Sequence, residues 1–170
     1  MTDQVRPFRQ GPVRADGLRI ALVASRFNEL VTERLLAAAR AALEQSGLRP
    51  PNIPVLQVPG ALEIPYGCHE AFRTLDVHAA VALGCVIRGE TAHFDLVAQG
   101  SAQGLREVSL KWDRPVLNGI LAVDQLDQAL DRAGGKSGNR GRDAALAALE
   151  MASLVRDLDA YSKSAAAPDD

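Results

Sequence analysis

The clearest indication of the fold is the segment Ala79-Ala80-Val81-Ala82-Leu83-Gly84-Cys85-Val86-Ile87. It is almost entirely apolar, carries no charge, and is short for a helix. A run of this kind is typical of a strand buried on both faces, as in a parallel sheet. The residues that follow, 92–110, have the spacing of a helix.

The same alternation of apolar runs and helical patterns continues in both directions along the chain. Strands are predicted over residues 19–24, 53–58, 79–87 and 115–123. Helices are predicted over residues 28–46, 62–74, 92–110, 125–132 and 143–158. Strands that alternate with helices form right-handed βαβ units. The sequence therefore predicts an α/β fold: a three-layer αβα sandwich around a four-stranded parallel sheet, with flavodoxin-like winding.

Length and composition indicate one soluble domain. The 170 residues and 18.1 kDa suffice for a hydrophobic core without a disulfide or a metal. We divide the chain into an N-terminal arm (1–16), a single domain (17–160) and a flexible C-terminal tail (161–170). The net charge of −2 argues against nucleic-acid and membrane partners. The polar N-terminus is not that of a signal peptide, and Cys68 and Cys85 have no C-x-x-C spacing, so a cytoplasmic location is expected.

Ligands of an open parallel sheet bind at the carboxyl ends of its strands. Four predicted loops occupy that edge: 25–28, 59–65, 88–95 and 118–124. None of them carries the glycine motif of a dinucleotide site, a P-loop or the clustered aspartates of a phosphoacceptor domain. The sequence of these loops therefore gives no support for the ligands that usually bind to this fold.

Phe27 and Glu63 are candidate ligand contacts in the first two loops. The position of Phe27 alone does not decide whether its ring is a stacking face for a planar ligand or part of the core. The flanking polar residues Arg26 and Asn28 favour a partly exposed ring that is available for stacking. Glu63, in the first turn of a helix, either holds ligand hydroxyls or is favoured there by the helix dipole alone.

The segment Gly89-Glu90-Thr91-Ala92-His93 opens a helix in the third loop. The free N–H groups of a helix start favour an anion such as phosphate. His93 is then near that anion, where proton transfer and a capping or packing role both remain open.

A glycine-rich connection between Arg132 and Arg140 is the fourth candidate. It is either a solvated link between two helices or an oxyanion site, because the arginine fork matches phosphate. His69 and His78 are expected to be structural. No His, Cys and carboxylate set has metal-ligand spacing, so no metal site is expected.

Taken together, four blocks resemble the 6,7-dimethyl-8-ribityllumazine synthase family, at residues 26–28, 60–65, 84–95 and 132–141. The resemblance runs in order from about residue 19 to residue 154. It implies a transferase of riboflavin biosynthesis that condenses 5-amino-6-(D-ribitylamino)uracil with 3,4-dihydroxy-2-butanone 4-phosphate. The products are the lumazine, phosphate and water, and the family needs no metal or organic cofactor.

The resemblance implies which residues bind the pyrimidine substrate. Phe27 would stack on the pyrimidine ring, and Ala61 and Glu63 would contact the ribityl chain. The backbone of Val86 and Ile87 would read the edge of the pyrimidine.

The resemblance also implies which residues act on the phosphate and on protons. Glu90 and Thr91 would form the phosphate turn, with Arg132 contributed by a neighbouring subunit. His93 would transfer protons, and Asp143 occupies the position of a carboxylate that assists it.

Three positions depart from the family pattern. Asn118 stands where the family often has Phe, Arg140 where Lys is usual, and Gly135 where Thr is frequent. Asn118 and Arg140 stay in the predicted binding set for the ribitylaminouracil, although part of the aromatic contact is missing.

The resemblance implies a homo-oligomer, a pentamer whose sites lie between subunits. The short glycine-rich connection 134–139 resembles that of members that form an icosahedral shell of 60 subunits, so such a shell is expected, with a pentamer or decamer as the alternative. The arm is expected to cross a neighbouring subunit as an added edge strand, with Arg6, Arg9 and Arg14 at subunit contacts.

The sequence also leaves two other functions open. One is a non-catalytic cage that binds flavin- or lumazine-like ligands on the same scaffold. The other is a different phosphosugar-processing enzyme, which would explain Thr91 and Arg132 but not Phe27.

Overall fold

The computed structural model describes residues 11–165. Four parallel strands form the main sheet, in the order β2-β1-β3-β4. Their bounds are Ile20–Ser25 for β1, Val55–Val58 for β2, Ala79–Ile87 for β3 and Val116–Val123 for β4. The central strands β1 and β3 are almost fully buried, as their apolar sequences predict. The strands β2 and β4 are the edges of the sheet, and both carry exposed side chains.

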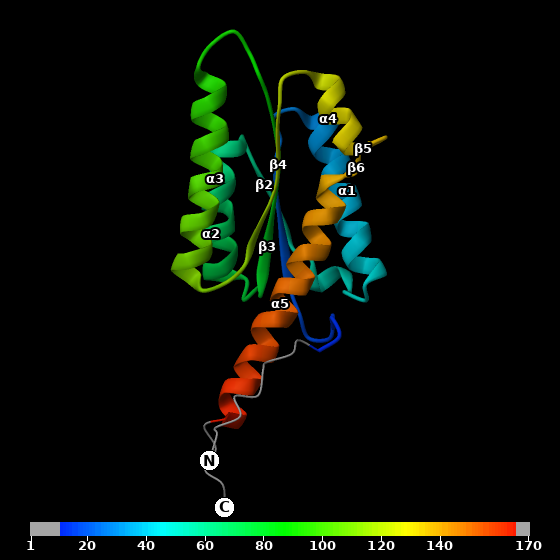
Figure 1. Cartoon of the computed structure of the whole chain (residues 1–170), viewed down its shortest axis with the longest axis vertical. Coiled ribbons are helices and arrows are strands. Elements are labelled where there is room, and N and C mark those ends of the chain that lie inside the picture. The colour runs from blue at the N-terminus through cyan, green and yellow to red at the C-terminus, as the bar shows by residue number, and fades with distance from the viewer. Residues whose placement is uncertain (1–10, 166–170) are drawn as a thin grey trace, which may run out of the picture.

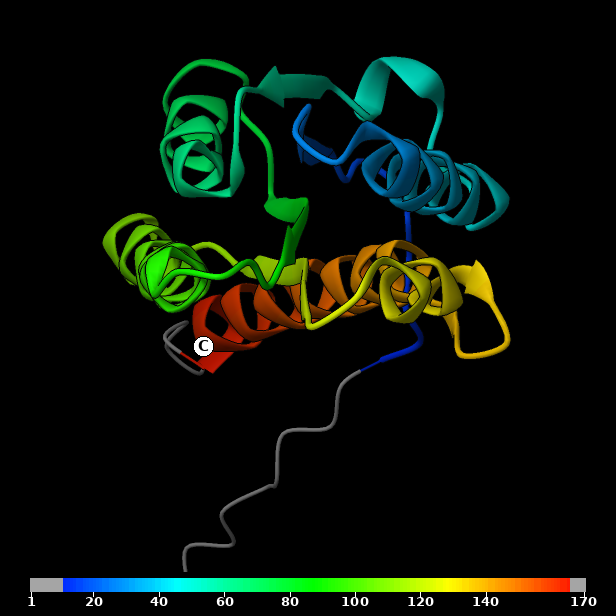
Figure 2. The same cartoon turned by 90° about the horizontal axis from the view of Figure 1, so that it is seen from above.

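Helices cover both faces of the sheet, so the chain has three layers (Figure 1). One face is covered by α1 (Glu29–Gln45), α4 (Leu126–Arg132) and α5 (Arg140–Ala165), and the other by α2 (Ile64–Thr74) and α3 (His93–Trp112). Seen from above, the pair α2 and α3 lies apart from α1 and α4, with the strands between them (Figure 2). The predicted α/β sandwich with flavodoxin-like winding is confirmed. None of the helices within residues 11–165 has both the length and the apolar composition of a membrane-spanning segment.

Neighbouring residues of each strand point into different layers. Leu22 packs in the cluster beneath α1 and α5, whereas Val23 packs in the cluster beneath α2 and α3. Both side chains are fully buried, and burial of a large aliphatic side chain contributes about 1.5–3 kcal/mol. The two clusters fix the sheet, and the loops at its carboxyl edge therefore start from a rigid base.

Two short 3₁₀ helices shift the predicted boundaries of β2 and α2. The first, η1 (Pro50–Asn52), ends where the Ile53 N–H donates to the carbonyl oxygen of Pro50 over 3.0 Å, so β2 starts later than predicted. The second, η2 (Ala61–Glu63), takes up the residues before α2. The elements themselves are those expected from the sequence.

The segment between α4 and α5 forms a small hairpin, which the sequence analysis did not predict. β5 (Ala133–Gly135) pairs with β6 (Gly138–Asn139) in antiparallel fashion. Gly134 and Gly138 have φ angles of 110° and 78°, a left-handed conformation that glycine adopts at little cost. The connection is thus an ordered turn rather than an unstructured link.

Helix α5 is longer than predicted at both ends. The Asn139 Oδ1 atom accepts the backbone N–H groups of Gly141 at 2.9 Å and Arg142 at 3.1 Å, as an N-cap side chain does. The helix therefore begins at Arg140. It continues to Ala165, so residues 161–165 are helical where the sequence analysis expects the flexible tail, and residues 166–170 lie outside the described part.

The described part of the arm, residues 11–16, lies against α5. Arg156 donates from Nη1 to the carbonyl oxygen of Asp16 over 2.8 Å and from Nη2 to that of Arg14 over 3.2 Å. The described part of the arm is thus fastened to α5. The expected contacts of Arg6 and Arg9 lie outside the described residues.

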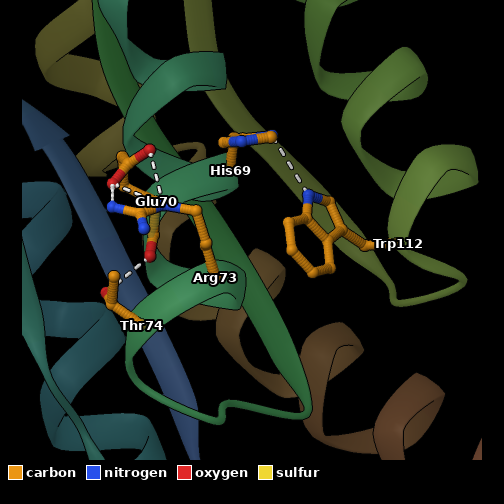
Figure 3. Close-up of polar contacts among 5 residues, drawn as sticks. All are labelled: His69, Glu70, Arg73, Thr74 and Trp112. Carbon is orange, nitrogen blue, oxygen red and sulfur yellow. Dashed lines mark hydrogen bonds and ion pairs between the residues drawn. The ribbon is translucent and has the colours of Figure 1, made fainter.

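The two histidines expected to be structural each have a partner within the fold. The Trp112 Nε1–H donates to His69 Nδ1 over 3.1 Å and so links α3 to α2 (Figure 3). The Arg19 N–H donates to His78 Nδ1, also over 3.1 Å. Neither histidine lies at the carboxyl edge of the sheet.

Candidate active site

A cavity of about 490 Å³ lies at the carboxyl ends of β1, β2 and β3, where the sequence predicted a ligand site. This volume is within the range of small-molecule sites. Three of the four predicted loops contribute to it. Its lining residues are Phe27, Gly60, Ala61, Leu62, Glu63, Cys85, Val86, Ile87, Gly89, Thr91, His93, Phe94 and Val97.

Phe27 lines this cavity with 71% of its surface exposed, so it is not a core residue. Its backbone N–H donates to the carbonyl oxygen of Pro59 over 3.1 Å, and the N–H of Arg26 donates to that of Val58 over 2.8 Å. These bonds fasten the loop after β1 to the end of β2. The ring is consequently held at the cavity with a free face for stacking.

Glu63 brings a carboxylate to the same cavity from the end of η2. A Cβ atom at Gly60 would lie 2.9 Å from Glu63 Oε2, so the glycine makes room for the carboxylate to fold back over the backbone. Ala61 between them is buried, whereas Glu63 is exposed. The carboxylate is therefore available as an acceptor for ligand hydroxyl groups.

Thr91 and His93 also line the cavity, at the start of α3. His93 is the first residue of this helix, one position later than the predicted start. The Thr91 Oγ1 atom accepts the His93 N–H over a long 3.4 Å, and both residues are exposed. A helix start of this kind attracts an anion. Glu90 lies in the same exposed loop but is not among the residues that line the cavity.

A second cavity, of about 320 Å³, runs along the free edge of β4. It is lined by Arg132 from the end of α4, Arg140 from the start of α5 and a run of β4 that begins at Asn118. The Asn118 Oδ1 atom accepts the Ile120 N–H over 2.9 Å. Arg132 donates from Nη1 to the carbonyl oxygen of Gln128 over 3.0 Å, so this hydrogen bond uses only one of the N–H donors of the guanidinium group.

The predicted site residues thus fall into two groups within one chain. The cavity beside β3 holds five of the residues assigned to the pyrimidine substrate, together with Thr91 and His93; the five are Phe27, Ala61, Glu63, Val86 and Ile87. The cavity beside β4 holds the other two, Asn118 and Arg140, and also Arg132. Asp143 lies next to this second cavity, with Oδ2 3.7 Å from Arg140 Nη1. One chain alone does not bring the arginines to His93.

Comparison with known proteins identifies the family. The family model described as 6,7-dimethyl-8-ribityllumazine synthase matches residues 17–156, which is most of the chain and includes both cavities. The chain belongs to the 6,7-dimethyl-8-ribityllumazine synthase family. The family resemblance drawn from the four sequence blocks is confirmed.

Named relatives agree with this lumazine synthase membership. A 6,7-dimethyl-8-ribityllumazine synthase of Salinibacter ruber is 49% identical over 150 residues, covering 88% of this chain and 96% of the relative. The enzyme of the same name from Kosmotoga olearia is 47% identical over 151 residues, covering 89% and 97% of the two chains. That of Clostridium kluyveri is 43% identical over 150 residues, covering 88% and 97%. The matched region therefore spans most of this chain and nearly the full length of each relative.

Several residues that line this candidate site were not predicted from the sequence. Cys85 and Phe94 lie inside the block 84–95, but an apolar residue at a strand end or helix start does not reveal which side it faces. Burial raises the pKa of the Cys85 thiol to about 11, so the sulfur stays protonated and contributes an apolar wall. Within residues 11–165, no cluster of three or more His, Cys, Asp or Glu side chains is arranged to hold a metal ion.

Proposed function

We propose that this chain condenses 5-amino-6-(D-ribitylamino)uracil with 3,4-dihydroxy-2-butanone 4-phosphate to give 6,7-dimethyl-8-ribityllumazine, phosphate and water. The family membership supports this reaction. The observation that carries it is the cavity at the carboxyl edge of the sheet, which is lined both by an exposed aromatic ring and by a threonine and a histidine at a helix start.

The pyrimidine substrate binds on the Phe27 side of the cavity. Its ring stacks on Phe27, while the backbone of Val86 and Ile87, at the end of β3, supplies donors and acceptors for its polar edge. Ala61 and Glu63 hold the ribityl chain, since the carboxylate of Glu63 accepts hydrogen bonds from hydroxyl groups. The support for these roles is that all five residues line the same cavity.

The butanone phosphate binds at the start of α3. Glu90 and Thr91 form the turn that surrounds its phosphate, and the free N–H groups of the helix start favour the negative charge. His93 moves protons during amine attack, phosphate loss and ring closure, because histidine exchanges protons near neutral pH. Asp143 of an adjacent chain assists it.

Much of the acceleration comes from holding two substrates together. An ideal arrangement of two reactants is worth up to about 7–11 kcal/mol of the barrier. Phosphate departs more readily when a cation neutralises its charge, which is the role of Arg132. A site of this kind depends strongly on complete assembly of its binding groups.

Arg132 reaches the phosphate from a neighbouring subunit. This proposal is supported by the separation of the two cavities within one chain and by the position of the second cavity at an open sheet edge. Asn118 and Arg140 accompany Arg132 and complete the ribitylaminouracil side. The resulting particle is a pentamer that assembles into a 60-subunit shell in the cytoplasm, with the compact β5–β6 hairpin leaving room where pentamers meet.

Turnover with the two purified substrates tests the function. We expect the absorbance of the lumazine to appear together with stoichiometric phosphate. Binding of a ribityl pyrimidine or a flavin without turnover would instead indicate a non-catalytic cage, and failure to bind any ribityl pyrimidine would indicate another phosphosugar enzyme. Light scattering tests the assembly: 60 copies of 18.1 kDa give about 1.1 MDa, whereas five copies give about 90 kDa.

A further inference from the structure

Arg88, the residue that follows β3, contacts three side chains around the start of α3. Its Nε atom donates to Asp124 Oδ1 over 2.8 Å, and its Nη1 atom lies 3.6 Å from Asp95 Oδ2. Its guanidinium carbon lies 4.0 Å from the centroid of the Phe94 ring, a cation–π distance. One side chain therefore joins the end of β3, the first turn of α3 and the segment after β4.

The backbone holds Arg88 in place for these contacts. Its N–H donates to the carbonyl oxygen of Val123 over 2.9 Å, which extends the pairing of β3 with β4 by one residue. Phe94 is 9% exposed and lines the cavity, so the ring beneath the guanidinium is also fixed. Arg88 thus belongs to the rigid sheet, while its side-chain partners Phe94 and Asp95 belong to the helix that carries His93.

We propose that Arg88 is a positioning residue whose guanidinium fixes the start of α3, and with it Thr91 and His93, against the ends of β3 and β4. Residues 89–92 form an exposed loop. Arg88 directly precedes this loop, and its side chain contacts Phe94 and Asp95, which follow the loop. The effect of Arg88 on catalysis rests on the proposed function, whereas its effect on the position of α3 does not depend on that function.

Electrostatics adds a second effect at the same place. Asp95 and Asp124 both lie beside the loop that would receive the phosphate, and Arg88 neutralises part of their charge. Without the guanidinium, two carboxylates would repel an incoming phosphate. Because the guanidinium already faces two carboxylates and a ring, it holds the loop rather than acting as a phosphate ligand.

Hydrogen exchange on the assembled protein without substrate tests the positioning directly. The variants are Arg88→Gln and Asp124→Asn, and the matched control is Arg73→Gln, which removes another exposed arginine–carboxylate pair, with Glu70 on α2 (Figure 3). We expect amides of residues 89–96 to exchange about two to five times faster in the first two variants and at the wild-type rate in the control. Unchanged exchange in Arg88→Gln would overturn the proposal.

Kinetics then separates positioning from ligand binding. We expect Arg88→Gln and Asp124→Asn to raise the KM for the butanone phosphate by about two- to fivefold and to lower kcat, with the KM for the pyrimidine unchanged. Arg88→Lys keeps the positive charge but loses the planar guanidinium group, so its KM and kcat should change less than those of Arg88→Gln. If Asp124→Asn keeps wild-type exchange and KM while Arg88→Gln loses phosphate affinity, Arg88 is a ligand and the positioning role is wrong. A wild-type protein without turnover would count against the proposed function, and the exchange result would still decide the role of Arg88.

Discussion

Asn28 donates a hydrogen bond from its Nδ2 atom to the backbone carbonyl oxygen of Cys85 over 2.7 Å. This bond ties the loop after β1 to the end of β3, across the floor of the candidate active site. Asn28 itself has φ 60° and ψ 46°, a left-handed conformation that asparagine tolerates better than most residues. The position of the neighbouring Phe27 ring therefore depends on both the side chain and the backbone of Asn28.

Replacing Asn28 tests this dependence. Asn28→Ala loses the hydrogen bond and adopts the left-handed conformation at a cost, so we expect a loss of about 2–3 kcal/mol in unfolding free energy. Asn28→Gly loses the bond but keeps the conformation, so we expect a smaller loss of stability. Both variants should bind the pyrimidine more weakly than the wild type. Thermal unfolding at matched protein concentration measures the stability difference, and an alanine variant as stable as the wild type would contradict this account.

Phe27→Ala should weaken binding of the pyrimidine by about 1–3 kcal/mol, the usual scale for stacking of a base on an aromatic ring. Since the ring is 71% exposed, the unfolding temperature should stay at the wild-type value. Phe27→Trp keeps a stacking face and should keep affinity. Calorimetric titration with the ribitylaminouracil measures the change, and equal affinity in the alanine and wild-type proteins would remove Phe27 from the site.

Arg132→Ala should raise the KM for the butanone phosphate far more than the KM for the pyrimidine, because the charge that pairs with Arg132 is on only one substrate. Initial rates with each substrate varied in turn give the two constants. Arg142→Ala, on the first turn of α5, is a control for the loss of an exposed positive charge. Equal effects of Arg132→Ala on both constants would point to a structural role for this arginine.

The two thiols should be unreactive in the folded protein. Burial raises the pKa of Cys68 from its ordinary 9.0 to about 12 and that of Cys85 to about 11, and both are free. A raised folded-state pKa gives stability that is complete below the unfolded-state value near 9 and is lost as the pH rises toward 11–12. We expect a thiol reagent to label neither cysteine at pH 8 until the protein is unfolded. Rapid labelling of Cys85 with the fold intact would show that the cavity floor is open.

The order of the strands and helices could be predicted because each element has a clear pattern. The apolar runs at 79–87 and 19–24 are buried on both sides, and the helices between them have apolar residues on one face. The β5–β6 hairpin could not be predicted, because its conformation comes from glycines with positive φ rather than from an apolar pattern. The early start of α5 depends on the cap from Asn139, a local bond that a hydrophobic pattern does not contain.

The candidate site could be predicted in part. The rule that ligands bind at the carboxyl ends of parallel strands located Phe27, Glu63, Thr91 and His93, and the structure brings these four to one cavity. The polar neighbours Arg26 and Asn28 favour a partly exposed ring at Phe27, and the structure confirms that the ring is exposed. Arg88 contacts Asp95 and Asp124, which lie 7 and 36 positions further along the chain. No local sequence motif indicates these contacts.

In the proposed site, Arg132 of an adjacent chain completes the cavity beside β3. His93→Ala should be slowed by about 10²–10⁴-fold, and Arg132→Ala should be nearly inactive at low butanone phosphate. The decisive measurement is the turnover of oligomers in which these two variants are mixed in equal amounts before assembly. If each site joins His93 of one chain with Arg132 of the next, about a quarter of the sites are intact, and about a quarter of the wild-type rate should return. A mixture no more active than the two separate variants would contradict the shared site.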